Sequence, residues 1–340
     1  MITLKDYQER VLESLGDFFR CTAQTKTPEV AFREVTRRFG EAAPYFPVSA
    51  AGLGPDMPYV CLRVPTGGGK TLLACYAAGL AQRQFMRAER AVVLWLVPSN
   101  TILDQTADAL RDPRHPYRRA LELACGAVEV MTIDEALRLS RAAVDGQTVV
   151  IVSTIQSFRV EDTTGRRVYD QNGAFSEHVM NVPPDRLGDL FPGADGKPKP
   201  SLVNALRLRR PIVIVDEAHT QRQQTTEFIK NNPEIRVIGL SASPFAEGLR
   251  NTYTKVVSAT TTAKLVDEGR LVPLRVFIAK EIDMTGAKKV AGEWSQGDAA
   301  TRGMKITGDV VAEWAKKTTE IFGGPRKTIV FCSNIAHGAD

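Results

Sequence analysis

A glycine-rich stretch between a strand-like run and a helix-like run constrains this chain more than any other feature. Residues 59–64 (YVCLRV) are mostly apolar, residues 65–71 read PTGGGKT, and residues 72–78 (LLACYAA) favour a helix. Because glycine has no Cβ, the backbone N–H groups of such a loop can turn inward and close on an anion. The helix after the loop adds the positive end of its dipole at the same point. Strand, glycine loop and helix in this order predict a phosphate-binding loop (P-loop).

The residues expected to hold a nucleotide are those of the loop itself, namely Thr66, Gly67, Gly68, Gly69, Lys70 and Thr71. Lys70 would reach the β- and γ-phosphates of ATP, which makes it a candidate catalytic residue, and the Thr71 hydroxyl would hold Mg²⁺. The general motif has a glycine six residues before the lysine, where this chain has Val64. A glycine-rich turn with a chance Lys-Thr pair is the alternative, but the flanking strand and helix argue against it.

A second apolar run ends in two adjacent acids. Residues 213–215 (VIV) are followed by Asp216 and Glu217, and then by Ala218 and His219. At the carboxyl end of a parallel strand, these side chains would point into the crevice where ligands bind. Asp216 suits Mg²⁺, usually through water, and Glu217 suits the polarisation of an attacking water molecule. An ordinary acidic loop is the alternative, and the phosphate-loop pattern upstream disfavours it.

From residue 59 onward, short apolar runs alternate with helical patterns. The predicted strands are residues 59–64, 91–97, 149–153, 212–216, 237–241 and 328–332. The predicted helices are residues 4–19, 28–39, 71–85, 101–110 and 225–230, with another near residue 261. Apolar runs without period-two alternation suit a sheet buried on both faces, and their alternation with helices indicates parallel strands. We therefore expect an α/β fold with a doubly wound, mostly parallel sheet.

Two segments interrupt this alternation. Residues 44–58 are rich in Pro and Gly and are predicted to be a connector. Residues 159–200 contain a Pro-Pro pair and end in GADGKPKP. We interpret residues 159–200 as a surface insertion on which few core contacts depend, with a dedicated functional loop as the alternative.

Size, charge and cysteine content limit the class of protein. The chain has 340 residues, more than one typical domain, and its 43% hydrophobic content suits a packed core. The net charge of +5 is a mild lean toward polyanions. Five cysteines without a Cys-x-x-Cys pair predict free thiols in a reducing compartment. The first residues contain no apolar signal, and the longest apolar run, 91–97, is too short to span a bilayer, so we expect a soluble cytoplasmic protein.

Together these motifs resemble those of the superfamily 2 helicases, specifically the DEAH-box branch. Residues 65–71 look like motif I, and residues 216–219 (DEAH) look like motif II. Residues 241–244 (SASP) look like motif III, where Ser243 replaces the usual Thr and keeps the hydroxyl. Weaker similarities are those of residues 97–101 to motif Ia, residues 153–157 to motif Ib, Tyr7-Gln8 to the adenine-reading Gln motif, and residues 329–336 to motif IV.

Within this superfamily the chain is most similar to the res (restriction/helicase) subunit of type III restriction enzymes. The similarity rests on the DYQ start at residues 6–8, the RVPTGGGKT loop and the long insertion before motif II. It implies a RecA-like P-loop NTPase domain and a hydrolase that uses Mg-ATP to move on nucleic acid, with duplex DNA as the expected track. It also implies a restriction or phage-defence role and partner subunits for modification or nuclease activity.

The resemblance also divides the chain. Residues 1–58 would form an N-terminal helical segment with the Gln motif, and residues 59–258 the RecA-like ATP-binding domain. Residues 259–340 would be a connector and the incomplete start of a second RecA-like domain. Motif V, the arginine-bearing motif VI and a nuclease constellation are not visible in the sequence. We therefore expect the N-terminal part of a longer motor, weakly active by itself.

Further roles are implied by the resemblance. Gln8 would read adenine. Coupling between the nucleotide and nucleic-acid sites is assigned to His219, Ser241 and Ser243. Backbone contacts to nucleic acid are assigned to Ser99, Thr101 and Thr154, whose hydroxyls are adequate phosphate donors. Helix capping is the alternative for Ser99 and Thr101. A basic track, or simply a solvated face, is suggested by Arg159, Arg166, Arg167, Arg207, Arg209 and Arg210.

Two other function classes compete with the motor. The first is a nucleotide-gated binding or scaffold module without productive hydrolysis, which the missing arginine-bearing lobe motivates. The second is a metabolic P-loop kinase. The SASP stretch after the second acid motif, and the lack of an Arg-rich lid segment, argue against the kinase.

Overall fold

The computed structural model describes most of the chain. The described residues are 3–38, 45, 47–158, 167–220, 222–232, 234–243, 249–258, 260–273, 283, 285–290, 293–295, 297, 301, 302 and 307–328. Contacts divide the chain into two compact units, residues 1–271 and residues 272–340. The first unit contains the large sheet and the candidate site.

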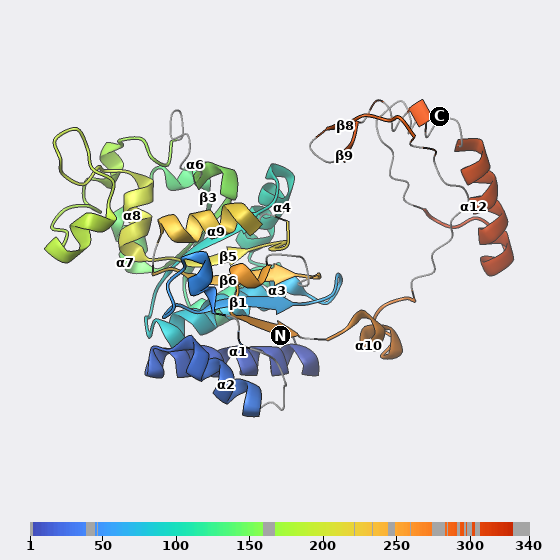
Figure 1. The fold of residues 1–340 in the computed structure, drawn as a ribbon, viewed down its shortest axis with the longest axis horizontal. Helices are drawn as coiled ribbons and strands as arrows, with labels where there is room; N and C mark the ends of the chain where they lie inside the picture. Colours follow the sequence, from blue (N-terminus) through green and yellow to red (C-terminus); the bar gives the residue numbers. More distant parts are fainter. Residues whose placement is uncertain are drawn as a thin grey trace. The chain divides into compact units, whose positions relative to one another are not determined.

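A seven-stranded sheet forms the centre of the first unit (Figure 1). Its strand order is β3-β4-β2-β5-β6-β1-β7, and every neighbouring pair is parallel. The strands are β1 (Tyr59–Arg63), β2 (Val92–Val97), β3 (Val128–Thr132), β4 (Thr148–Thr154), β5 (Ile212–Val215), β6 (Arg236–Ser241) and β7 (Lys255–Ser258). All seven strands therefore end at the same edge of the sheet.

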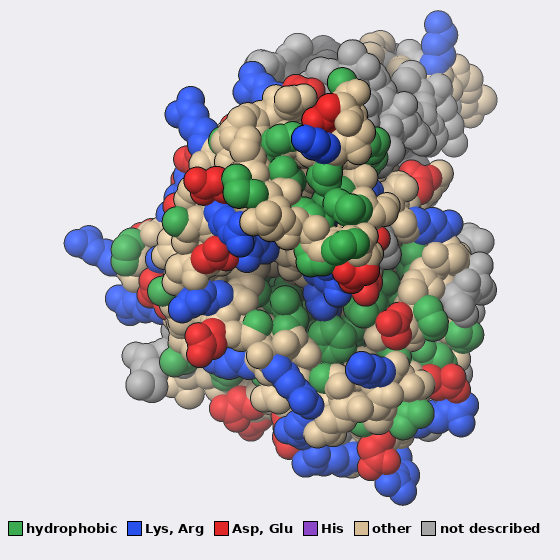
Figure 2. Space-filling view, turned by 90° about the vertical axis from the view of Figure 1, so that its left-hand side faces the viewer, with side chains coloured by type: hydrophobic (Ala, Val, Ile, Leu, Met, Phe, Trp, Pro, Cys, Tyr) green, Lys and Arg blue, Asp and Glu red, His purple; other side chains and the backbone are tan. Residues whose placement is uncertain are grey.

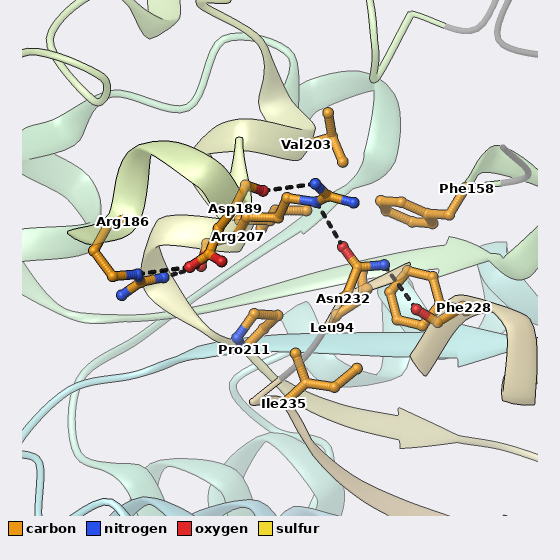
Figure 3. A pocket seen from close by; sticks show the side chains of 11 residues that line it. Leu94, Phe158, Arg186, Asp189, Val203, Arg207, Pro211, Phe228, Asn232 and Ile235 are labelled. Carbon is orange, nitrogen blue, oxygen red and sulfur yellow. Dashed lines mark hydrogen bonds and ion pairs between the residues drawn. The ribbon is translucent and has the colours of Figure 1, made fainter. Parts of the chain in front are cut away.

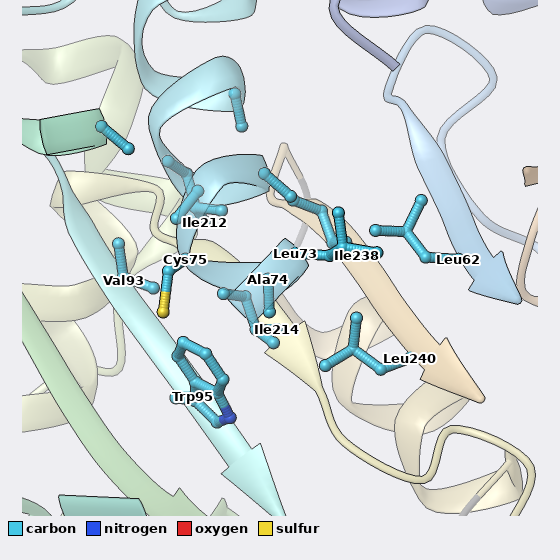
Figure 4. Close-up of a cluster of buried hydrophobic side chains, with 14 of the residues drawn as sticks. Leu62, Leu73, Ala74, Cys75, Val93, Trp95, Ile212, Ile214, Ile238 and Leu240 are labelled. Carbon is cyan, nitrogen blue, oxygen red and sulfur yellow. The ribbon is translucent and has the colours of Figure 1, made fainter. Parts of the chain in front are cut away.

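Both faces of the sheet are buried, which explains the uninterrupted apolar runs. Along β2, Val93 and Trp95 belong to one core cluster, while Val92 and Leu94 belong to the other. Because successive side chains of a strand point to opposite faces, a strand covered on both sides must be apolar at every position. Figure 4 shows the first cluster, in which Cys75 of the helix after the glycine loop lies over Val93 and Trp95.

Helices cover the two faces from opposite sides, with α1 and α2 on one side and α8 and α9 on the other (Figure 1). The first cluster takes side chains from α1 (Asp6–Thr25), α2 (Pro28–Arg38), α3 (Lys70–Leu80), α4 (Asn100–Arg111) and α5 (Pro116–Cys125). The second takes side chains from α6 (Ile133–Ala136), α7 (Arg141–Gly146), α8 (Leu202–Arg209) and α9 (Arg222–Asn231). The short turns are η1 (Val48–Ala51), η2 (Ala81–Phe85), η3 (Ile155–Phe158), η4 (Gly173–Phe175), η5 (Pro184–Asp189) and η6 (Leu249–Asn251).

The predicted α/β fold with a parallel sheet is confirmed. The predicted runs from residue 59 to residue 241 correspond to β1, β2, β4, β5 and β6. Strands β3 and β7 were not predicted, because both lie at the edges of the sheet and are less apolar. Strand β3 carries the partly exposed Glu129, and the side chains of β7 alternate between buried and exposed. An edge strand needs no continuous apolar run.

The expectation of a surface insertion at residues 159–200 stays a prediction, although the described part of the segment contributes side chains to the core. Within residues 167–200, five side chains are buried, namely Val168, Tyr169, Phe175, His178 and Leu190, and the first three of these belong to the second core cluster. The Tyr169 hydroxyl donates to the carbonyl of Phe158 at 2.8 Å, which joins the segment to the turn after β4. The physical reason is that the second sheet face is apolar and α8 and α9 are short, so this segment completes the cover.

Arg207 of α8 ties the same segment to the rest of the unit (Figure 3). Its Nη1 donates to the carbonyl of Asp189 at 2.6 Å, and its Nε donates to Asn232 Oδ1 at 3.2 Å. Burial lowers the pKa of Arg207 from its ordinary value. The cavity beside these groups, lined also by Phe158 and Phe228, measures about 20 Å³ and has room for one water molecule. It is a packing defect and too small for a ligand.

Phe175→Ala tests the structural role of this segment. Phe175 is fully buried, so the truncation should lower the free energy of unfolding by about 3–5 kcal/mol in a urea titration. Met180→Ala is the matched control, because Met180 is 57% exposed in the same segment and its loss should change stability by less than about 0.5 kcal/mol. If both substitutions change the free energy of unfolding by the same small amount, the segment contributes little to the core and is a surface insertion.

The second unit is described in parts. Strands β8 (Lys289–Val290) and β9 (Glu293–Trp294) pair antiparallel, and α12 spans Thr307–Phe322. The motif IV similarity at residues 329–336 lies outside the described residues, so the start of a second RecA-like domain stays a prediction. The predicted boundary between residues 258 and 259 also stays a prediction. Contacts group residues 259–271 with the first unit, where Leu265 is buried.

Two further observations concern the described helices and cysteines. Among the described residues, no helix combines the length and the apolarity needed to cross a membrane. The described cysteines, Cys21, Cys61, Cys75 and Cys125, are free thiols. Burial raises the pKa of the Cys61 and Cys125 thiols to about 12, so both are unreactive.

Candidate nucleotide site

The parallel sheet brings the candidate residues to one edge. The glycine loop follows β1, Asp216 follows β5, and Ser241 ends β6. Ser99 and Thr154 lie at the corresponding ends of β2 and β4. The nucleotide candidates therefore stand over β5, β6 and β1, and the nucleic-acid candidates stand over the adjoining β4 and β2. Ligands of open α/β sheets bind at this carboxyl edge.

The glycine loop has a backbone that suits an anion and excludes side chains. Gly67 and Gly69 have φ angles of +80° and +88°, which residues with a Cβ rarely adopt. A Cβ on Gly68 would lie 2.8 Å from Val64 Cγ1, inside contact distance. Helix α3 begins at Lys70 without a side-chain cap, which leaves its first N–H groups to an anion.

An ion pair joins the glycine loop to the acid motif. Lys70 Nζ lies 2.6 Å from Glu217 Oε1, although the two residues are 147 positions apart in the sequence. Glu217 has a left-handed φ of +46°, which costs a non-glycine residue roughly 1–3 kcal/mol. With this backbone conformation, the Glu217 carboxylate faces Lys70 and the loop. The structure therefore brings together two residues that the sequence analysis placed in one site.

Asp216, the first residue after β5, is partly buried. Burial raises the pKa of Asp216, and the charge of Glu217 raises it further. The N–H of Glu217, which donates to Asp216 Oδ1 at 3.0 Å, and the charge of Lys70 act in the opposite direction. The role of Asp216 in holding a cation stays a prediction.

His219 and Ser241 connect the ends of β5 and β6. His219 Nδ1 lies 3.0 Å from Ser241 Oγ and 3.4 Å from Glu217 Oε2. Ser241 Oγ also accepts from the N–H of Ser243 at 3.0 Å. A chain of contacts thus runs from Glu217 to the segment after β6. The coupling role of these residues stays a prediction, and the geometry is compatible with it.

Gln8 lies against the phosphate loop. Its Nε2 donates to the carbonyl of Gly68 at 3.1 Å, and its Oε1 accepts from the N–H of Lys5 at 3.0 Å. Both ends of the amide are engaged, so the reading of adenine by Gln8 stays a prediction. The Tyr7 hydroxyl donates to the same Gly68 carbonyl at 2.8 Å. The sequence analysis included Tyr7 in the Gln-motif similarity but assigned a function to Gln8 alone, so the contact between Tyr7 and the loop is an addition from the structure.

The candidate nucleic-acid contacts have mixed local roles. Ser99 caps α4, since its Oγ accepts from the N–H of Ile102 at 3.4 Å. Thr101 is exposed in the first turn of α4, and Thr154 is partly buried at the end of β4. The capping alternative therefore holds for Ser99, while a cap and a phosphate contact remain compatible in one residue. Their contact with nucleic acid stays a prediction.

The arginines considered for a basic track are engaged within the protein where the structure describes them. Arg207 binds backbone carbonyls, Arg209 lies 2.8 Å from Asp145, and Arg210 pairs with Glu234. Arg159 and Arg166 lie outside the described residues. Basic and acidic side chains are interspersed over the described part of the face in Figure 2. These arginines favour a structural role over a continuous track.

The donor set fits a magnesium nucleotide better than a metal alone. No group of three or more His, Cys, Asp and Glu side chains in the described part of the chain could hold a metal ion. Thr71 and Asp216 supply one hydroxyl and one carboxylate, and Mg²⁺ takes further oxygens from phosphates and water. The glycine cradle beside them provides the place for those phosphates. These residues fit a cation that arrives with a nucleotide.

Asp216→Asn should stabilise the ligand-free chain at neutral pH. Because the folded-state pKa of Asp216 is raised, the ionised carboxylate opposes folding above that pKa. This opposition disappears as the pH falls below the pKa of Asp in the unfolded chain. The stability gain from Asn should therefore be present at pH 7 and vanish toward pH 3, in denaturant titrations at both pH values. A loss of stability at pH 7 would contradict this account of the site.

Comparisons with known proteins place the chain in a family. The family model described as "Type III restriction enzyme, res subunit" matches residues 1–246. A 51.5 kDa protein of a Lactococcus phage (isolate 7-9) is 30% identical over 118 residues, which cover 32% of this chain and 25% of that protein. This chain therefore spans about a quarter of that relative.

Two solved structures share a low similarity with the chain. UvsW of bacteriophage T4 has 15% identity and a TM-score of 0.34, covering 66% of this chain and 36% of UvsW. A nuclease-deletion mutant of the type ISP restriction-modification enzyme LlaGI, in complex with a DNA substrate mimic, has 14% identity and a TM-score of 0.42, covering 99% and 26%. The family match covers well over half of the chain and agrees with the motifs, so the chain belongs to the family of the res subunit of type III restriction enzymes.

Proposed function

We propose that this chain is the nucleotide-binding part of an ATP-dependent nucleic-acid motor, a helicase or translocase that hydrolyses ATP to ADP and phosphate. The observation that carries the proposal is the ion pair between Lys70 and Glu217, with 2.6 Å between Nζ and Oε1. Through it, the glycine loop after β1 lies within reach of the acids after β5. Phosphate binding and water activation require such groups in one site.

The loop and the acid motif divide the work of holding Mg-ATP. The backbone of residues 66–69 and the Lys70 ammonium bind phosphate oxygens, while the Thr71 hydroxyl and the Asp216 carboxylate hold Mg²⁺. Mg²⁺ supplies neutralisation of the negative charge on the phosphates. Every one of these groups lies at the carboxyl edge of the sheet, beside the uncapped start of α3.

Glu217 is proposed to be the general base. Lys70 Nζ lies 2.6 Å from Glu217 Oε1, so binding of phosphates by Lys70 would release this carboxylate oxygen. The released carboxylate orients a water molecule and accepts its proton. His219, 3.4 Å from Glu217 Oε2 and 3.0 Å from Ser241 Oγ, then carries the change toward β6. Ser243 belongs to the same chain of contacts.

Nucleic acid is proposed to bind over the adjoining ends of β2 and β4. Hydroxyls of Ser99, Thr101 and Thr154 would bind its phosphates without reading sequence. Duplex DNA is the proposed track, within a restriction or phage-defence system that includes modification or nuclease partners. The family assignment and the position of these residues next to the nucleotide edge support the proposal.

Stimulation of ATP hydrolysis is the test of the track. Duplex DNA should raise the rate of phosphate release by the 340-residue chain more than single-stranded DNA or RNA does, measured at equal nucleotide concentration and low salt. Because phosphate contacts are screened, the stimulation should fall steeply as salt rises. An equal response to all three nucleic acids, or a larger response to single-stranded DNA or RNA, would contradict the choice of duplex DNA.

Substitutions at Lys70 and Glu217 should separate binding from chemistry. Lys70→Ala removes a charge-assisted contact and should weaken Mg-ATP binding by roughly tenfold to a hundredfold in calorimetry. Glu217→Gln keeps the shape and removes the base. It should bind Mg-ATP nearly normally and slow single-turnover hydrolysis by about 10²–10⁴-fold.

Glu122→Gln is the control for Glu217→Gln, because Glu122 is an exposed glutamate of α5 paired with Arg118. It should leave both binding and hydrolysis unchanged. If Lys70→Ala binds as tightly as the unchanged chain, the phosphate site is wrongly assigned. If Glu217→Gln hydrolyses ATP at the full rate, the base is another group.

A nucleotide-gated module without hydrolysis is the second candidate function. The observation that favours it is the same ion pair, because a base neutralised by Lys70 is inactive until a ligand separates the two. The single-turnover measurement distinguishes the candidates. A gated module would bind Mg-ATP, lose that binding in Lys70→Ala, and show no difference in hydrolysis between Glu217→Gln and the unchanged chain.

A further inference from the structure

The last part of the first unit packs beside the phosphate loop. We name residues 261–271 the α10 strap, which consists of α10 (Thr262–Asp267) with its capping residue and the turn after it. Thr261 caps the helix, since its hydroxyl accepts from the N–H of Lys264 at 3.2 Å. Leu265 is only 1% exposed and anchors the helix in the unit. The buried Leu265 therefore fixes the helix of the strap in the first unit, and the turn at residues 268–271 follows directly after this helix.

The turn after α10 has its direction set by backbone hydrogen bonds. Gly269 has a φ of +65°, and its N–H donates to the carbonyl of Val266 at 2.9 Å. The N–H groups of Arg270 and Leu271 both donate to the carbonyl of Leu265, at 2.8 Å and 3.0 Å. This is the pattern of a Schellman motif with glycine at the left-handed position. The positions of Arg270 and Leu271 are thus built into the backbone.

These two residues lie against the nucleotide site. Leu271 Cδ2 is 3.1 Å from the point where a Cβ on Gly67 would stand, so the leucine covers that side of the loop. Arg270 pairs with Glu268 at 2.7 Å. Both charges act on the Tyr7 hydroxyl. Burial is the main cause that raises the pKa of Tyr7, with Arg270 opposing and Glu268 adding to it. Tyr7 in turn donates to the carbonyl of Gly68.

We propose that Leu271 is a positioning residue of the nucleotide site, which acts through Gly67 and is itself placed by the Gly269 turn. The inference rests on the proposed function and deepens it. Three consecutive glycines give the loop wide conformational freedom, and ordering them opposes binding. A side chain held against Gly67 restricts that freedom before a ligand arrives. Tyr7 and Gln8, in the N-terminal helix, both donate to the carbonyl of Gly68 and so restrict this neighbouring glycine as well.

The strap also connects the loop to the second unit along the chain. Leu271 ends the first compact unit, and the next residue begins the second. If Leu271 favours the ligand-ready loop, then by thermodynamic reciprocity a bound nucleotide favours the ordered strap. Binding of a nucleotide in the phosphate loop would thereby increase the order of residues 268–271, where the connector begins. Residues 268–271 would thus couple nucleotide binding to the connector, a role that neither the glycine loop nor the acid motif performs.

The experiment measures binding of a fluorescent, non-hydrolysable ATP analogue with Mg²⁺ to the 340-residue chain. Leu271→Ala should weaken binding about threefold to tenfold, and Leu271→Met should restore it to within about twofold. Val272→Ala is the control, because the adjacent Val272 is 87% exposed. Thermal unfolding of Leu271→Ala should match the unchanged chain, which separates positioning of the loop from loss of fold.

Gly269→Ala tests the turn independently. No atom lies within 4 Å of a Cβ built on Gly269, so the substitution introduces only the strain of its positive φ. It should weaken analogue binding as Leu271→Ala does. Gly196→Ala is the matched control, because Gly196 has a φ of +74° and equally open surroundings in the remote 167–200 segment. Hydrogen exchange at the Arg270 and Leu271 amides should slow when the analogue binds.

Each outcome bears on the proposal. If Lys70→Ala weakens analogue binding while Leu271→Ala and Gly269→Ala bind normally, the positioning role is overturned and the proposed function stands. If Lys70→Ala binds normally, the nucleotide site itself is wrong and the inference falls with it. Unchanged exchange at residues 270 and 271 on binding would remove the link to the connector, even if Leu271→Ala weakens affinity.

Discussion

Burial of one parallel sheet on both faces is the constraint on which the rest of this structure depends. Parallel pairing points every strand in one direction, so the ends of β1, β5 and β6 share an edge. Burial of both faces forces the strands to be apolar, which leaves polar chemistry to the loops beyond their ends. The glycine loop and the acid pair meet there, although β6 separates their strands in the sheet.

The site concentrates features that oppose stability, and the surrounding core supports them. Glu217 has a left-handed backbone, and burial penalises the charge of Asp216. The start of α3 has no side-chain cap. Strained and partly desolvated groups of this kind collect at functional sites. In the ligand-free chain, the ion pair between Lys70 and Glu217 offsets part of this opposition by satisfying two charges with each other.

Two segments that look peripheral in the sequence have central contacts. Residues 167–200 complete the second sheet face, with Phe175 fully buried in that core. Residues 261–271 come after the last strand of the large sheet and return to the glycine loop, where Leu271 meets Gly67. In both cases one buried apolar side chain anchors a short helical element, Phe175 in η4 and Leu265 in α10. The amino-acid composition of a loop predicts where turns form, but it does not predict which of its side chains is buried in the core.

The sequence by itself determined the α/β class, the central strands and the residues of the glycine loop and acid motif. These signals are local, since apolar runs and short motifs record burial and chemistry within a few residues. Only the tertiary structure decided that Tyr7 and Leu271 touch the phosphate loop, that Lys70 holds Glu217, and that Phe175 is core. Such contacts join residues far apart in the chain, and the packing that selects them leaves no pattern at neighbouring positions.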